Sequence, residues 1–306
     1  MADRLIFIVG PTAIGKTGIS FEIAKLIECE IISCDSMQVY RGMNVGTSKP
    51  AKVLLGSLPH HLVDIIDPSE EFSVAQFRAL AVKAIEEMIP RKKTPLLVGG
   101  SGLYVKVLID GIFEAPVTDW ELRQRLEEEA AEFGIGQLYA RLKQADPAGA
   151  AGIHPNDLRR IIRALEVFEK ANAPISELRK RTSGLGDKYN VRIFGLSMER
   201  EALYRKIDER VDQMFSEGLI NEARALMATG GISFTASQAL GYKELFGHLA
   251  GAYDLEEAKR LVKRNTRHFA KRQLTWFRRD KRIEWMELDE NFDTGDTARA
   301  IWKKLS

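Results

Sequence analysis

The sequence predicts an α/β fold with a parallel sheet core and an inserted all-helical domain. Three short apolar runs, at residues 5–9, 30–34 and 95–98, each end in a polar or Gly-rich turn and are separated by amphipathic stretches. Such alternation is typical of parallel strands joined by helices, and ligands of these sheets bind beyond the carboxyl ends of the strands. Between residues 120 and 178, in contrast, only the helical period occurs, which predicts a separate domain.

The chain is therefore expected to divide into three segments. The periodicity changes near Glu114, and a Gly-rich turn at residues 183–186 marks the return from helices to a strand. Residues 1–115 are predicted to form the first part of the phosphate-binding core described below. Residues 116–184 form the helical insertion, and residues 185–306 the second part of the core.

Gly and Pro residues within these segments predict where single helices and strands end. In the insertion, Gly-Ile-Gly at 134–136, Asp-Pro at 146–147 and His-Pro at 154–155 interrupt the helical period. After the insertion, residues 191–196 read as a strand and residues 283–288 as a closing strand. Long amphipathic helices are expected between these two strands.

The composition predicts a globular protein of the cytoplasm. Hydrophobic residues make up 45% of the 306 residues and charged residues 29%, as expected for a chain with a well-filled core. No apolar run approaches the ~18–20 residues that span a bilayer, and the N-terminus has no signal-peptide pattern. The two cysteines, Cys29 and Cys34, are too few for a disulfide framework. We therefore expect no membrane partner and a monomer.

The net charge of +2 conceals a strongly basic segment. Residues 259–282 hold eleven Lys or Arg and one acid, Asp280, which gives +10 for this segment and −8 for the rest. Two adjacent rows with a spacing of four residues contain Lys259, Lys263, Arg267 and Lys271, and Arg260, Arg264, His268 and Arg272. A structural ion-pair face would need interleaved acids, which the segment almost lacks. We therefore expect contact with a nucleic-acid backbone.

Residues 10–17, between the first predicted strand and helix, match the phosphate-loop pattern GxxxxGK[ST]. Glycines let backbone amides surround phosphate oxygens, and the helix N-terminus adds positive potential. Lys16 would reach the terminal phosphate, and the Thr17 hydroxyl would bind Mg²⁺ as the metal ligand. The core is thus expected to be P-loop NTPase-like. The residues expected to bind the phosphate chain are Gly10, Pro11, Thr12, Ala13, Ile14, Gly15, Lys16 and Thr17.

The loop alone does not identify the phosphate compound. No guanine-recognition motif and no clear Walker B strand occur, which disfavours a GTPase and a motor ATPase. A small-molecule kinase is the alternative that stays open. Asp35 follows the second predicted strand and should lie near the loop. Its carboxylate could bind Mg²⁺, act as a general base or cap the next helix.

Eight ordered motifs carry a resemblance to a known family. They occupy residues 10–17, 35–40, 42–47, 59–62, 99–104, 154–160, 239–244 and 266–276. Together they resemble the tRNA dimethylallyltransferase (tRNA isopentenyltransferase) family in its short, bacterial-type form. Ser101 stands where the family often has Thr, which keeps the hydroxyl.

The resemblance implies transfer of a dimethylallyl group from dimethylallyl diphosphate to N6 of the adenine 3′ of the anticodon (position 37) in tRNA, with release of pyrophosphate. Mg²⁺ would be the cofactor and the anticodon stem-loop the partner. Lys16, Thr17 and Arg210 would stabilise the leaving pyrophosphate, and Asp35 would accept the adenine proton. Without the resemblance, Arg210 reads as part of a solvated helix face, and the alternative function is a small-molecule P-loop kinase.

An adenine in a stacked anticodon loop must be extruded to present N6. The resemblance implies that Asp35, Ser36, Met37, Gln38 and Ser101 line the channel that receives it. From the residues alone, Met37 fits a core position about as well.

The helical insertion offers a further candidate surface for tRNA. Residues 156–157, Asn-Asp, can cap a helix whose apolar stripe includes Ile161 and Ile162, and three arginines fall outside that stripe. A solvated arginine face is the alternative. Beyond the adenine channel, the expected tRNA-binding residues are Arg123, Arg159, Arg160, Ile161, Ile162, Arg163, Arg267, Lys271 and Arg272.

Overall fold

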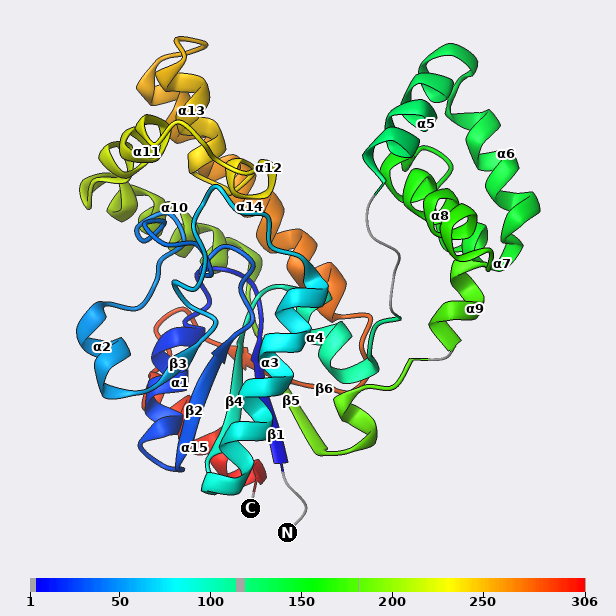
Figure 1. The fold of residues 1–306 in the computed structure, drawn as a ribbon. Helices are drawn as coiled ribbons and strands as arrows, with labels where there is room; N and C mark the ends of the chain where they lie inside the picture. Colours follow the sequence, from blue (N-terminus) through cyan, green and yellow to red (C-terminus); the bar gives the residue numbers. More distant parts are fainter. Residues whose placement is uncertain (1–3, 114–118, 181, 306) are drawn as a thin grey trace. The chain divides into compact units, whose positions relative to one another are not determined.

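The chain folds into two units, which the computed structural model describes over residues 4–113, 119–180 and 182–305 (Figure 1). The first unit comprises residues 1–109 and 185–306, and the second comprises residues 110–184. The predicted boundary between residues 115 and 116 lies outside the described residues. Entry to and exit from the second unit lie side by side, because the Thr182 hydroxyl donates to the Asp110 carbonyl oxygen at 3.1 Å.

One six-stranded sheet forms the centre of the first unit, and every pair of neighbouring strands is parallel. The strands are β1 (Arg4–Val9), β2 (Cys29–Ser33), β3 (His60–His61), β4 (Thr94–Gly99), β5 (Asn190–Met198) and β6 (Ile283–Leu288). Their order across the sheet is β3-β2-β4-β1-β5-β6. The predicted parallel α/β sheet is confirmed, and all five predicted strands are present. β3 was not predicted, because two residues are too few to show a period.

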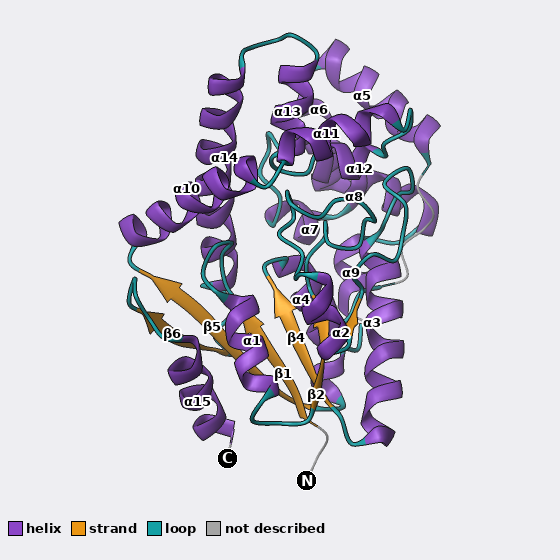
Figure 2. Cartoon of the chain, turned by 90° about the vertical axis from the view of Figure 1, so that its left-hand side faces the viewer, coloured by secondary structure: helices purple, strands orange, loops and turns teal. Residues whose placement is uncertain are grey.

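Helices of the first unit either pack along the sheet or stand beyond the carboxyl ends of its strands (Figures 1 and 2). Those along the sheet are α1 (Lys16–Ala24), α3 (Val74–Met88), α4 (Gly102–Asp110) and α15 (Thr294–Leu305). Those beyond the strand ends are α10 (Arg200–Ser216), α11 (Leu219–Ala228), α12 (Phe234–Ser237), α13 (Tyr242–Leu249) and α14 (Leu255–Phe277). The short α2 (Lys52–Ser57) precedes β3.

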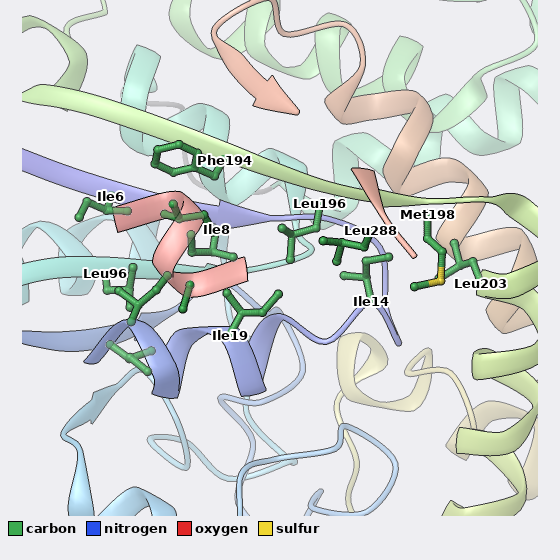
Figure 3. Packing of buried hydrophobic residues seen from close by; sticks show 14 of the residues in the cluster. Ile6, Ile8, Ile14, Ile19, Leu96, Phe194, Leu196, Met198, Leu203 and Leu288 are labelled. Atoms are coloured by element: carbon green, nitrogen blue, oxygen red, sulfur yellow. The ribbon is translucent and has the colours of Figure 1, made fainter. Parts of the chain in front are cut away.

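The main core lies between the sheet and the α1–α15 pair. Because side chains alternate along a strand, Ile6 and Ile8 of β1 point to the same face, where they join Ile19 of α1 (Figure 3). Ile14 of the phosphate loop is also fully buried in this cluster. The loop is therefore anchored to the core by an apolar side chain.

The second unit is helical throughout its ordered elements. Its helices are α5 (Trp120–Phe133), α6 (Ile135–Ala145), α7 (Pro147–Ala151), α8 (Leu158–Ala171) and α9 (Ile175–Lys180). Helix ends coincide with the Gly-Ile-Gly and Asp-Pro breaks in the sequence. The unit has a core of its own, to which Leu126, Leu138 and Leu165 contribute. Among the residues that the structure describes, no helix is both long and apolar enough to cross a bilayer.

Candidate active site

A cavity of about 890 Å³ lies within the first unit, at the carboxyl ends of β1, β2 and β4. Its walls come from the phosphate loop, the loops that follow β2 and β4, one face of α10, the link between α12 and α13, and α14. These segments are far apart in the sequence. They meet because the carboxyl ends of parallel strands share one edge of the sheet.

The phosphate loop has the tight conformation that its glycines predict. Gly15 caps α1 in the left-handed region, with φ of 89°, and a Cβ at this position would lie 2.6 Å from the ring of Phe292. Ala13 also has positive φ, 64°, which costs a non-Gly residue conformational energy. The loop thus leads directly into the N-terminus of α1, as expected of a P-loop NTPase-like core.

Lys16 lies inside this loop and is poorly hydrated. Its ammonium group donates to the carbonyl oxygens of Gly10 at 3.0 Å and Pro11 at 2.7 Å. Burial and, less strongly, the positive charge of Arg210 lower the pKa of Lys16 to about 7, while the negative charge of Asp35 opposes both effects. An anion that entered the cavity would favour the protonated form of Lys16 and raise its pKa again.

Arg210 reaches the same cavity from α10. Burial lowers the pKa of Arg210, and the charge of Asp35 again opposes the shift. The structure thus brings Lys16, Arg210 and Asp35 together, as the sequence predicted for a pyrophosphate site. Arg210 is only partly exposed and lines the cavity, which does not fit a fully solvated helix face.

Asp35 caps the turn that follows β2 and also faces the cavity. Its Oδ1 accepts from the backbone N–H of Met37 at 2.8 Å and, more weakly, from that of Gln38 at 3.4 Å. No residue that the structure describes donates to the second carboxylate oxygen, Oδ2. The capping role left open by the sequence is therefore present, on a turn and not on a helix, while the roles in proton transfer and Mg²⁺ binding stay predictions.

The remaining residues predicted for the adenine channel also line the cavity. The Ser101 hydroxyl accepts from the backbone N–H of Ser36 at 3.2 Å, so it holds the turn after β2 in place. Gln38 accepts from the Ser33 hydroxyl at 2.9 Å and donates to the Thr47 carbonyl oxygen at 3.3 Å. The Gln38 amide is thereby oriented from both ends.

Glu222, which no sequence motif singled out, anchors the loop that supplies Thr47. Its carboxylate accepts from the backbone N–H groups of Asn44, Val45 and Gly46 at 2.9, 3.0 and 3.1 Å. The buried Tyr242 hydroxyl donates to the same carboxylate at 2.5 Å. No sequence signal links these partners, because the loop and α11 are separated by more than half the chain.

Thr17 lines the cavity at the first turn of α1 with an exposed side chain. Among the described residues, no group of three or more His, Cys, Asp and Glu side chains could hold a metal by itself. A single hydroxyl nevertheless fits Mg²⁺, which prefers to keep water and phosphate oxygens as its other ligands. The donor set is therefore compatible with a metal that binds together with a phosphate chain.

Several residues predicted to bind tRNA have structural roles in the helical unit. Ile161 and Ile162 are 0% and 4% exposed and belong to the unit's core, so their side chains cannot contact RNA. Arg123 and Arg163 both pair with the fully buried Glu166, at 2.8 and 2.5 Å. A buried carboxylate requires such partners, so these arginines stabilise the fold.

Arg159 and Arg160 remain at the surface of α8. Arg160 pairs with the helix-capping Asp157 at 3.0 Å, an exposed contact that adds little stability. Of the residues in the insertion that were predicted to bind tRNA, these two are the exposed ones.

The basic rows of α14 are paired more extensively than predicted. Asp212 of α10 contacts Lys259 and Lys263, each at 2.8 Å, and Asp208 of α10 contacts Arg267 at 2.6 Å. The segment itself almost lacks acids, but three members of one row have acidic partners on a neighbouring helix, so this row is also a structural ion-pair face.

Lys271 and Arg272, toward the C-terminal end of α14, are exposed. Neither makes an ion pair with a residue that the structure describes. The exposed Lys and Arg side chains of α14 that make no ion pair with a described residue are therefore Arg264, Lys271 and Arg272, and Arg272 lines the cavity.

The pKa of Lys16 predicts how binding of inorganic pyrophosphate depends on pH. A bound polyanion raises the pKa of Lys16 above about 7, so binding takes up a proton, and affinity should fall as the pH rises above about 7. Calorimetric titration between about pH 6 and pH 9 measures this slope. Lys16→Arg, which stays charged, should show only the titration of the ligand, and identical profiles for the two proteins would contradict the prediction.

Comparison with known proteins identifies the family. The sequence model described as IPP transferase matches residues 38–280. A tRNA dimethylallyltransferase of Geobacter sulfurreducens is 46% identical, over 96% of this chain and 95% of its own length. That of Carboxydothermus hydrogenoformans is 48% identical, over 100% and 97%.

Solved structures agree with this result. A tRNA isopentenylpyrophosphate transferase from Bacillus halodurans matches with a TM-score of 0.72 and 44% identity, covering 99% of this chain and 95% of its own. A eukaryotic dimethylallyltransferase, whose structures were determined acting on tRNA, matches with a TM-score of 0.81 and 28% identity, covering 98% and 78%. The chain therefore belongs to the IPP transferase family.

Proposed function

We propose that the chain transfers a dimethylallyl group from dimethylallyl diphosphate to N6 of adenine 37, 3′ of the anticodon in tRNA, and releases pyrophosphate. The observation that carries this proposal is the cavity in which the phosphate loop, Arg210 and Asp35 meet. The names of the relatives support prenyl transfer to tRNA and not the alternative of a small-molecule kinase.

Two cations of the chain suit the departure of pyrophosphate. The allylic C–O bond breaks as negative charge grows on the diphosphate, and Lys16 and Arg210 are preorganised in a poorly hydrated cavity to stabilise it. Loss of one such group typically costs ~2.7–4 kcal/mol of activation free energy. Mg²⁺ bound at Thr17 would neutralise further charge on the diphosphate.

The carboxylate of Asp35 is suited to activate the amino group of the adenine that receives the dimethylallyl group. The N6 lone pair of adenine is delocalised into the ring, so the amino group needs a base to take its proton as the new N–C bond forms. Asp35 offers Oδ2 for this proton while Oδ1 is held by the Met37 backbone. Ser36, Met37, Gln38 and Ser101 would surround the adenine, with the Gln38 amide oriented to meet its polar edge.

The cavity also has an apolar side that suits a five-carbon chain. Val211 and Met214 of α10 face the same cavity as Val262 and Phe269 of α14. A prenyl diphosphate could place its charged end against the phosphate loop and its apolar end against these side chains.

For tRNA, we propose contacts with the exposed cations Lys271 and Arg272 of α14 and Arg159 and Arg160 of α8. These side chains could approach phosphates without first breaking a buried ion pair. We further propose that the protein acts in the cytoplasm as a monomer, since the proposed chemistry requires one cavity in one chain.

The direct test is a transfer assay. Labelled dimethylallyl diphosphate, Mg²⁺ and unmodified tRNA are incubated with the protein, and the label is located after digestion to nucleosides. We expect it on N6 of adenosine from position 37, with one pyrophosphate released for each group transferred. ATP-dependent phosphorylation of a metabolite, without label in tRNA, would support the kinase instead.

Replacement of Asp35 by Asn should lower kcat for transfer by about 10²–10⁴-fold, because the amide can cap the turn but cannot accept a proton. Pyrophosphate should still bind, because Lys16 and Arg210 stay in the cavity. Asp67→Asn is the matched control, since Oδ1 of Asp67 likewise accepts from a backbone N–H two residues later, at 3.0 Å, and Asp67 lies outside the cavity. Turnover by Asp35→Asn near that of the control would exclude Asp35 as the base.

Salt dependence should report the contribution of the α14 cations to tRNA affinity. The double variant Lys271→Gln, Arg272→Gln should bind tRNA more weakly and reduce the slope of log K against log salt by about 2, one unit for each phosphate that no longer meets a cation. Filter binding across a salt series measures this slope. Lys303→Gln, at the exposed end of α15, should leave the slope unchanged. Equal slopes for the double variant and the wild type would contradict a tRNA contact by these two cations of α14.

A further inference from the structure

Gln273 of α14 connects two loops that carry the reacting groups. Its side chain is buried, with the residue only 7% exposed. Oε1 accepts from the backbone N–H of Thr12 in the phosphate loop at 2.9 Å, and Nε2 donates to the carbonyl oxygen of Gly100, after β4, at 2.9 Å. A buried amide that uses both its donor and its acceptor is held in one orientation.

The fit around this amide leaves no spare room. A Cβ on Gly100 would overlap Nε2 of Gln273, so only glycine permits the contact. The backbone N–H of Thr12 is also committed to Gln273. In this arrangement the N–H of Thr12 is not available to a phosphate, and Thr12 is left with its hydroxyl.

From Gly100 the connection continues to the carboxylate side of the cavity. The next residue, Ser101, donates its backbone N–H to the Cys34 carbonyl oxygen at 3.1 Å, and its hydroxyl accepts from the Ser36 N–H at 3.2 Å. Asp35 lies between these two contacts. Gln273 therefore links the loop that would hold the diphosphate to the turn that carries the proposed base.

We propose that Gln273 is a positioning residue for prenyl transfer: it sets the separation between the diphosphate loop and the Asp35 turn, and so the approach of the adenine to the allylic carbon. The inference rests on the proposed function. Gln273 touches neither substrate in this role and acts only through Thr12 and Gly100. Correct placement of two reactants can account for a large part of a rate, and small displacements cost about 10–100-fold.

In the Gln273→Glu variant, the pH decides whether the side chain can still contact Gly100, while the contact with Thr12 persists. An ionised carboxylate still accepts from Thr12 but repels the carbonyl oxygen of Gly100, whereas a protonated carboxyl group has the shape of the amide and can donate to Gly100. Burial raises the pKa of such a carboxyl group, which brings its titration toward neutral pH.

We therefore expect kcat of Gln273→Glu, divided by kcat of the wild type at the same pH, to fall about 10–100-fold between about pH 6 and pH 9. KM for either substrate should stay within about twofold of the wild-type value. Gln137→Glu, the same change at an exposed position of α6, should keep a ratio near one. Melting temperatures at each pH show that the folded protein is assayed. A ratio that stays flat over this range would overturn the proposal.

Gln273→Met provides a second, independent measurement. Met has a similar length and stays uncharged, but it cannot form either hydrogen bond, so a folded Gln273→Met variant should have a lower kcat at every pH. A wild-type kcat in that variant would also overturn the proposal. Failure of the wild type to prenylate tRNA would instead contradict the proposed function, so the two failures are distinguishable.

Discussion

Two positive charges held in one poorly hydrated space are the constraint on which the site depends. Burial disfavours the charged form of both Lys16 and Arg210, the charge of Arg210 disfavours that of Lys16 further, and a single carboxylate, Asp35, opposes these effects. Such an arrangement is costly for a protein alone and favourable around a polyanion, which restores the balance of charge. The parallel sheet makes it possible, because its carboxyl edge brings a loop, a turn and a helix from distant parts of the chain to the same place.

Local patterns account for what could be predicted from the sequence. The apolar runs that became β1, β2, β4, β5 and β6 are each visible within a few residues, and the phosphate loop is recognised from eight consecutive residues. The place of Asp35 followed from the same logic, since a residue after a parallel strand lies at the ligand-binding edge.

Long-range pairing accounts for what could not be predicted. The basic rows of α14 looked unpaired because their partners, Asp208 and Asp212, lie on α10. Glu166 similarly converts Arg123 and Arg163 from candidate RNA contacts into supports of the helical fold. In each case the charge of a residue was evident from the sequence, and the fold decided whether that charge faces a protein carboxylate or water.

The Glu222 contact has a mechanical consequence. Three successive amides of the loop at residues 44–46 are tied to α11 by one carboxylate, and Tyr242 of α13 braces that carboxylate. The same loop holds the Gln38 amide through Thr47. A tilt of α11 would therefore move the loop at residues 44–46 and, through Thr47, displace the Gln38 side chain. A helix that does not itself line the cavity can in this way change the position of a side chain that does.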